Sequence, residues 1–127
     1  MSRRGFTLLE VMIVLTIVAI LASIAIPMYQ SVILRTKEAV LKDSLYTLRS
    51  LIDAHTADKK AAPQSLEDLV AAGYLREIPE DPFTQSASTW VVEFGDAMIP
   101  GQLTTGIVDV HSGSPEISSE GTPYSEW

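Results

Sequence analysis

The sequence predicts an α+β fold in which one long N-terminal helix packs on a small antiparallel β-sheet. Three observations support this prediction. Residues 6–28 are almost uniformly apolar, residues 29–58 have helical periodicity without Gly or Pro, and two short runs rich in β-branched and aromatic residues follow. The 127 residues are about the length of one domain. We therefore expect a helix with a membrane-spanning half and an amphipathic half, followed by a single small globular part.

Residues 6–28 read FTLLEVMIVLTIVAILASIAIPM and hold one charge, Glu10. At 1.5 Å per residue, about 20 helical residues cross the roughly 30 Å hydrocarbon core of a bilayer. Pro27 lies near the end of this run, where a break or kink costs least. Two arginines precede the run and no basic residue follows it closely, which predicts a cytoplasmic N-terminus. A plain membrane anchor is the simplest interpretation; the run is too long for a secretory signal peptide.

Glu10 is the unusual residue of the apolar run. An ionisable side chain in a membrane span costs about 2.5–3.5 kcal/mol unless it reaches the interface or finds a partner. Two interpretations stay open at this point: the side chain extends to the cytoplasmic face, or another chain supplies an opposite charge. The span holds no Lys, Arg or His that could serve as that partner.

The amphipathic half of the helix is predicted from one apolar stripe. Its members recur at the spacing of a single helix face, and they are Leu41, Leu45, Leu48, Ile52 and His55, with Leu34 one heptad before Leu41. We expect this stripe to pack on the globular part, with His55 as a packing residue and not a ligand.

A second, short helix and two strands are predicted after the long helix. Pro63 marks a break, Ser65 and Asp68 have the spacing of a capping box, and Gly73 is a helix stop. Residues 74–83 contain two prolines and are predicted as turns. The strand candidates are 89–94 and 106–111. In the second strand we expect Val108 and Val110 to share one face and Asp109 and His111 the other.

The composition excludes several classes of function. The 16 Asp and Glu residues outnumber the 9 Lys and Arg residues, the net charge is −7, and no Lys or Arg follows Arg76. Such a chain lacks the basic surface that nucleic-acid binding needs. It has no cysteine, and so no disulfide or thiolate chemistry. No P-loop, H-E-x-x-H or G-x-S-x-G motif is present. Asp109, His111 and Ser112 are too close in sequence to face one another as a triad, so we predict no enzymatic activity.

Residues 3–10, RRGFTLLE, resemble the processing motif of type IV pilins and type II secretion pseudopilins. The resemblance implies that residues 1–5 are a leader peptide, that a prepilin peptidase cuts between Gly5 and Phe6, and that Phe6 becomes the N-methylated terminus. It further implies a pilin-like division into a filament-core helix, 6–28, and a helix continuation with a periplasmic globular domain, 29–127.

The same resemblance gives Glu10 and Pro27 roles in assembly. In the family, the glutamate at this position pairs with the terminal ammonium of an adjacent subunit, here Phe6, and a proline at the position of Pro27 commonly kinks the helix. A buried carboxylate is heavily penalised when unpaired, so this pair would select one axial stagger between helices. We state this as a hypothesis about register.

Within the family, the segment from Gly73 to Phe83, GYLREIPEDPF, resembles the G-type major pseudopilin of type II secretion, with Phe83 in place of the usual tryptophan. Many type IV major pilins close their C-terminal loop with a disulfide, which a chain without cysteine cannot form. The G type holds this loop with calcium. Here Glu116 and Glu120 stand where the family's aspartates are expected, with Asp109 a weaker candidate. The alternative is an acidic, solvated loop without a metal.

The resemblance implies a structural function: a major pseudopilin that polymerises with itself and with minor pseudopilins into a filament that helps move proteins across the outer membrane. It also implies a prepilin peptidase, an inner-membrane assembly platform and an ATPase as partners, and no nucleic acid. The subunit would sit in the inner membrane, with its globular domain periplasmic, before it joins a periplasmic or extracellular filament. The competing function is a type IV pilus subunit for adhesion or motility. The sequence leaves open that choice, the secreted substrates, and the symmetry and length of the filament.

Overall fold

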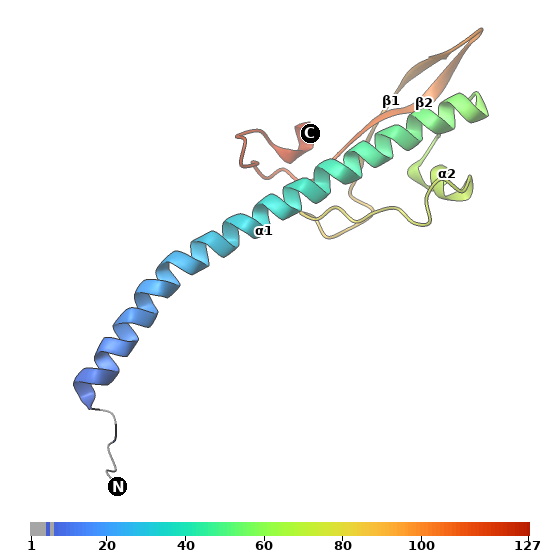
Figure 1. Cartoon of the computed structure of the whole chain (residues 1–127). Coiled ribbons are helices and arrows are strands. Elements are labelled where there is room, and N and C mark those ends of the chain that lie inside the picture. Colours follow the sequence, from blue (N-terminus) through green and yellow to red (C-terminus); the bar gives the residue numbers. More distant parts are fainter. Residues whose placement is uncertain (1–4, 6) are drawn as a thin grey trace. The chain divides into compact units, whose positions relative to one another are not determined.

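The computed structural model describes Gly5 and residues 7–127 of the chain. Its elements are helix α1 (Leu8–Lys59), helix α2 (Leu66–Ala71), strand β1 (Val91–Ile99), strand β2 (Gln102–His111) and a 3-10 turn, η1 (Tyr124–Glu126) (Figure 1). The chain divides into two compact units, residues 1–35 and 36–127, and α1 contributes to both. This is the α+β, pilin-like arrangement that the sequence predicts.

Helix α1 continues without interruption through the apolar run and the amphipathic stripe. Its 52 residues correspond to about 78 Å at 1.5 Å per residue. Pro27 lies inside the helix, not at a break. Proline has no N–H to donate to the carbonyl four residues earlier, so a helix tolerates it only where the rest of the hydrogen-bond ladder holds the segment.

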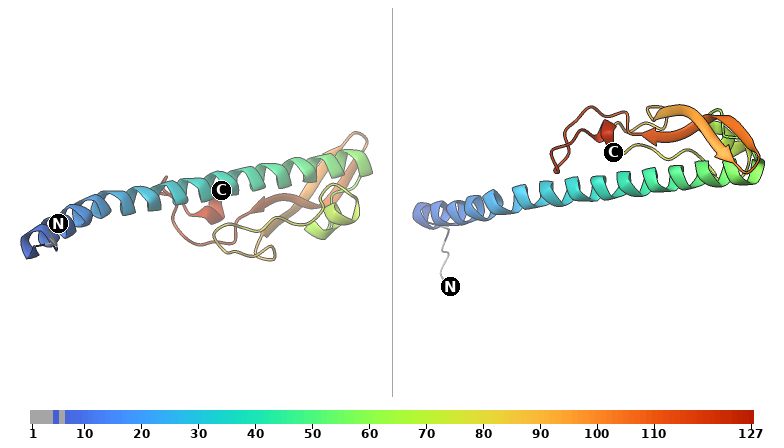
Figure 2. Two further views of the ribbon diagram at one scale, coloured as in Figure 1. Left: turned by 60° about the horizontal axis from the view of Figure 1, so that its bottom comes forward. Right: turned by 90° about the horizontal axis from the view of Figure 1, so that it is seen from above.

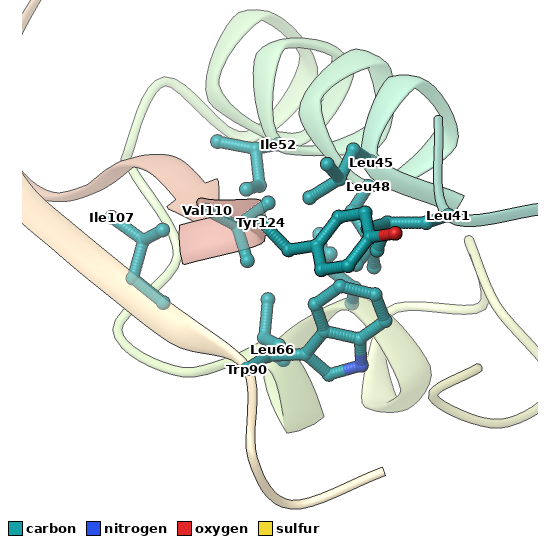
Figure 3. Packing of buried hydrophobic residues seen from close by; sticks show 10 residues of the cluster. Leu41, Leu45, Leu48, Ile52, Leu66, Trp90, Ile107, Val110 and Tyr124 are labelled. Atoms are coloured by element: carbon teal, nitrogen blue, oxygen red, sulfur yellow. The ribbon is translucent and has the colours of Figure 1, made fainter. Parts of the chain in front are cut away.

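The core of residues 36–127 forms between α1 and the segments that follow it. The predicted stripe is confirmed: Leu41, Leu45, Leu48, Ile52 and His55 are all buried. The four aliphatic residues of the stripe pack with Leu66 and Leu69 of α2, Trp90 just before β1, Ile107 and Val110 of β2, and Tyr124 of η1 (Figure 3). Leu34 departs from the prediction, because it is 39% exposed. It belongs to residues 1–35, and the packed stripe begins after it.

Strands β1 and β2 pair antiparallel as one hairpin, which runs beside the C-terminal part of α1 (Figures 1 and 2). Both strands extend beyond the predicted ranges, to a two-residue turn at Pro100 and Gly101. Gly101 has φ +82°, a conformation that glycine adopts without steric cost. The two strands form the whole sheet within the described residues.

A β-bulge changes the predicted faces of β2. Glu93 pairs with Asp109 and Phe94 pairs with Ile107, so Val108 is the extra residue. Ile107 and Val110 are therefore the fully buried side chains of this strand, and Val108 is only half-buried. The prediction that Val108 and Val110 share one face is wrong, since the bulge shifts the alternation by one position.

The short helix α2 and the turn-rich segment after it cover the core. Asp68 accepts hydrogen bonds from the Gln64 N–H at 2.7 Å and the Ser65 N–H at 3.3 Å, at the predicted start of the helix. In the following segment, Asp81 is fully buried and accepts from the Ser112 hydroxyl and, at 2.9 Å, from the Phe83 N–H. This contact joins the proline-rich turns to the end of the hairpin.

Candidate functional site: the helix start and the C-terminal anchor

The start of α1 is capped by Thr7. The Thr7 hydroxyl oxygen accepts a hydrogen bond from the Glu10 N–H at 3.1 Å, and the Thr7 carbonyl accepts from the Val11 N–H at 3.1 Å. Glu10 thus lies in the first helical turn, where unpaired N–H groups and the helix dipole favour a carboxylate. The Thr7-x-x-Glu10 spacing is a sequence signal of this cap, which sequence analysis overlooked in favour of the pairing role.

The predicted processing site lies directly before this cap. Gly5 is exposed, and no heavy atom lies within 4 Å of the point where a side chain would begin. Phe6 and residues 1–4 lie outside the described residues, so cleavage and methylation stay predictions. Glu10, by contrast, is described, and it is solvent-exposed at the start of α1.

The first part of α1 exposes an extended apolar surface. Among the described residues, one helix, α1, is long and apolar enough to cross a membrane. The most apolar 18-residue stretch of this helix has no buried residue. Polar side chains in this part bond to their own helix: the Thr16 hydroxyl donates to the Met12 carbonyl at 2.8 Å, and the Ser23 hydroxyl to the Ile20 carbonyl at 2.6 Å. Such a surface is suited to lipid or to neighbouring apolar helices.

A buried carboxylate on α1 anchors the C-terminal segment, by which we mean residues 112–127. Glu38 is 7% exposed. It accepts three hydrogen bonds from that segment: from the Ser119 N–H at 2.9 Å, the Ser119 hydroxyl at 2.6 Å and the Tyr124 hydroxyl at 2.8 Å. The Tyr124 ring in turn stacks on Phe83, with centroids 3.8 Å apart. One side chain therefore fixes two points of the segment, and Tyr124 extends the contact to the turns at residue 83.

The hydrogen bonds determine the titration of this pair. Burial works to raise the pKa of Glu38, but the bonds from Ser119 and Tyr124, together with the nearby charge of Lys42, outweigh it and lower the pKa below its ordinary value. Burial and the Glu38 carboxylate raise the pKa of the Tyr124 phenol. Both shifts favour a carboxylate that accepts from a neutral phenol at pH 7.

Two basic residues of α1 complete the anchor. The Lys42 ammonium lies 2.9 Å from Glu120 and 4.7 Å from the centre of the Trp127 ring. Arg49 donates to the Asp109 carboxylate at 2.7 Å, to the Val110 carbonyl at 2.9 Å and to the Trp127 main-chain oxygen at 2.6 Å. The segment is therefore attached to α1 at Glu38, Lys42 and Arg49, which lie roughly one helical turn or two apart.

The residues predicted to hold calcium do not come together as a cage. Glu120 pairs with Lys42, and Glu116 is exposed. The main-chain oxygens of Glu116, Ser118 and Thr122 accept N–H bonds from Tyr124, Gly121 and Ser118, respectively. Calcium requires six to eight oxygen ligands. Glu116 and Glu120 therefore do not form a ready-made cage here, and calcium binding at these residues stays a prediction for solution measurements.

Sequence analysis missed the residue that anchors the segment, although a signal for it was present. Glu38 lies three positions before Leu41 and seven before Leu45, on the face of the buried stripe. A charged residue at a stripe position must have a buried partner, because an unpaired carboxylate in a core is strongly disfavoured. The partners themselves, Ser119 and Tyr124, could not be inferred from spacing.

The structure and the N-terminal motif together define a membrane-anchored, pilin-like α+β protein. The family described as the prokaryotic N-terminal methylation motif matches residues 1–26. Type II secretion system core protein G of Klebsiella pneumoniae is 30% identical over 90% of this chain and 86% of its own length, and that of Pseudomonas aeruginosa is 33% identical over 65% and 72%. The chain belongs to the type II secretion system core protein G family.

Other comparisons are weaker in coverage. The type IV major fimbrial protein FimA of Dichelobacter nodosus is 42% identical, over 47% of this chain and 38% of its own length. No solved structure matches the chain significantly. The identity to the fimbrial protein thus covers less than half of each chain, whereas the identity to a core protein G reaches across most of both.

Proposed function

We propose that the chain is the major pseudopilin of a type II secretion pseudopilus, a structural subunit that polymerises into a filament and helps move proteins across the outer membrane. The observation that supports this most directly is the extent of similarity to core protein G, over 90% of the chain. The similarity to a fimbrial protein supports the shared architecture, and it makes a type IV pilus subunit the second candidate.

Before assembly, the apolar part of α1 holds the subunit in the inner membrane. Two arginines before this part favour a cytoplasmic N-terminus, and the globular domain would then be periplasmic. A prepilin peptidase cuts between Gly5 and Phe6 and leaves Phe6 as the methylated terminus. The exposed Gly5 backbone is compatible with this cleavage.

During assembly, the apolar surface of α1 leaves the lipid and packs against neighbouring subunits. Extraction from the bilayer needs work that this chain cannot supply, so an ATPase and a membrane platform are required as partners. The anchored C-terminal segment keeps the globular domain in one shape outside the filament core. No catalytic role is needed: the Ser112 hydroxyl is committed to buried Asp81, away from the contact between His111 and Asp109.

Deletion of the gene in its native host tests this function. We expect the secreted proteins to accumulate in the periplasm, and secretion to return when the wild-type chain is supplied from a plasmid. A matched measurement is electron microscopy at native expression. Long extracellular fibres built mainly from this chain, with secretion intact in the deletion strain, would show that the pilus function is correct instead.

A further inference from the structure

We propose that Glu93, Asp109 and His111 form a binding site for a divalent transition-metal ion. The three side chains lie on the paired strands β1 and β2, at the end of the hairpin away from its turn. Their ligand atoms all lie within 4.8 Å of one another. This site is separate from the predicted calcium residues Glu116 and Glu120, and it does not depend on the secretion function.

The distances between the ligand atoms suit a small ion. The His111 Nε2 lies 3.5 Å from the Glu93 Oε2 and 3.5 Å from the Asp109 Oδ2. A tetrahedral zinc ion with bonds of about 2.0–2.1 Å places its ligands about 3.3–3.4 Å apart. The remaining pair, the Glu93 and Asp109 oxygens, lies within 4.8 Å, so coordination requires rotation of the exposed Glu93 side chain toward Asp109.

Two of the ligands are already oriented by other contacts. The His111 Nδ1 lies 2.7 Å from the Trp127 main-chain oxygen, and this contact holds the ring with Nε2 directed at the Glu93 and Asp109 carboxylates. The Asp109 Oδ1 accepts from the Arg49 guanidinium at 2.7 Å and from the Val110 N–H at 2.8 Å. This leaves Oδ2 for the ion. Ligand orientation by a main-chain oxygen and by an outer charged partner is typical of metal sites.

The pairing of the strands gives the site an electrostatic reason to hold a cation. Glu93 and Asp109 are direct cross-strand partners, and like charges in this position destabilise a sheet. Arg49 neutralises one oxygen of Asp109, its Oδ1. A divalent ion bound beside His111 would offset both charges.

The ligand set selects the class of ion. One imidazole and two carboxylates suit zinc and neighbouring first-row metals, and three protein ligands leave one position for water. Calcium requires six to eight oxygens and magnesium prefers an octahedral oxygen shell, and this site supplies neither. We therefore expect zinc and cobalt to bind, and calcium and magnesium to compete weakly.

The test uses the full chain without an affinity tag, purified in detergent and treated with a chelator. Zinc titration by calorimetry should give one ion per chain, and Co²⁺ should give the intense visible absorption of a four-coordinate site. Glu93→Gln should abolish both signals, because a neutral amide is a poor ligand for zinc. The fold should be unaffected, because the Glu93 side chain is exposed and glutamine keeps its shape. His111→Gln should also abolish them. Glu77→Gln, an exposed carboxylate outside the cluster, is the matched control and should bind as the wild type does.

Each outcome bears on the proposal. Absence of zinc binding in the wild type would overturn it. Equal binding by the wild type and Glu93→Gln would overturn it as well, because the ion would then be bound elsewhere. Displacement of zinc by equimolar calcium or magnesium would refute the assignment to transition metals. If His111→Gln unfolds through loss of its contact with Trp127, the comparison of Glu93→Gln with Glu77→Gln still decides.

Discussion

Glu38 joins parts of the chain that are 81 and 86 residues apart, since its carboxylate accepts from Ser119 and from Tyr124. A chain without cysteine cannot close its C-terminal segment with a disulfide, and the segment is instead attached to α1 through hydrogen bonds and ion pairs. Such an anchor differs physically from a covalent bond, because it depends on the charge state of one side chain. Two predictions at the scale of the residue follow from that dependence.

Glu38→Gln should destabilise the globular domain by about 1–3 kcal/mol. Glutamine keeps the shape of the side chain but has one acceptor oxygen beside buried Tyr124, so at least one donor of Ser119 or Tyr124 loses its partner. Chemical denaturation of the full chain in detergent, followed by circular dichroism, measures the difference. Asp43→Asn, an exposed carboxylate on the same helix, is the matched control and should leave the free energy of unfolding within about 0.5 kcal/mol of the wild type. Equal effects of the two variants would show that Glu38 is not an anchor.

The stability of the domain should fall in acid, in part because of Glu38. Its folded pKa is lowered from 4.5, so its carboxylate stabilises the fold fully above that value and loses the contribution as the pH falls through the lowered pKa. The melting temperature of the wild type should therefore drop more steeply below about pH 4.5 than that of Glu38→Gln. Parallel profiles for the two proteins would contradict this, and differential scanning calorimetry from pH 3 to pH 7 provides the measurement.

At the scale of the element, the helices were predictable because helix formation is local. The spacing of Leu41, Leu45 and Leu48 gave the buried face of α1, and Pro63 and Gly73 bounded the segment that holds α2. The hairpin was only partly predictable. Residues 95–105 lack a strong β pattern, and strand pairing across the Pro100–Gly101 turn extended both strands. The bulge at Val108 depends on how β1 and β2 are aligned, and the sequence of one strand alone does not determine that alignment.

Gly106 permits a close approach that a side chain would block. A Cβ at this position would lie 2.7 Å from the Pro63 carbonyl oxygen and 2.8 Å from the Ala62 Cβ. The Ile107 N–H donates to the same Pro63 oxygen at 2.8 Å, so the strand cannot retreat without loss of that bond. Gly106→Ala should therefore destabilise the domain by about 1–3 kcal/mol, measured by denaturant unfolding.

The cross-strand partner of Gly106 supplies the control. Gly95 lies opposite it, and a Cβ there would meet only the Val108 side chain, at 3.1 Å and 3.7 Å. Val108 is half-buried and can shift, while both substitutions reduce the entropy of the unfolded chain equally. We expect Gly95→Ala to cost clearly less than Gly106→Ala. The reverse order would mean that the packing of the hairpin on residues 62–64 is not the constraint.

At the scale of the whole molecule, the segregation of charge and apolar residues along the sequence was sufficient to predict two physically different parts. The large apolar residues from Leu8 to Met28 lie exposed on α1, and the acidic residues after Arg76 belong to the globular domain. The candidate metal ligands were harder to predict, because ligand sets assemble in three dimensions. Glu120 was chosen for its place in an acidic loop, yet Lys42, 78 residues earlier, pairs with it.

The C-terminal segment should hold its structure without calcium. Lys42 already pairs with the Glu120 carboxylate, and N–H groups within the segment already bond to several of its main-chain oxygens, among them those of Glu116, Ser118 and Thr122. The melting temperature of the full chain in detergent should therefore be the same with millimolar calcium and with a calcium chelator. An ion that binds only the folded state raises stability by RT ln(1 + [L]/Kd), about 2.7 kcal/mol at 100 times Kd. A shift of that order, lost in Glu116→Gln, would restore the calcium site.

Glu10 has one role that the structure shows, in the capped first turn, and one that is only predicted, in filament assembly, and one experiment can separate them. Within one chain, Glu10 belongs to the capped first turn of α1, where its N–H bonds to Thr7. Between chains, its carboxylate is predicted to pair with the Phe6 ammonium of a neighbour. Thr7→Ala removes the cap, at a cost of about 1 kcal/mol, and keeps the charge. Glu10→Leu removes the charge and keeps an apolar helix.

If pairing between chains sets the register, Glu10→Leu should be cleaved and methylated normally but should fail to enter filaments, whereas Thr7→Ala should be cleaved and should assemble. Mass spectrometry of the mature N-terminus reports processing, and sedimentation of filaments with immunoblotting and electron microscopy reports assembly. Normal assembly of Glu10→Leu would refute the pairing role. Failure of Thr7→Ala with intact processing would instead assign the effect to the helix cap, because a frayed first turn would misplace the carboxylate that the neighbouring ammonium must reach.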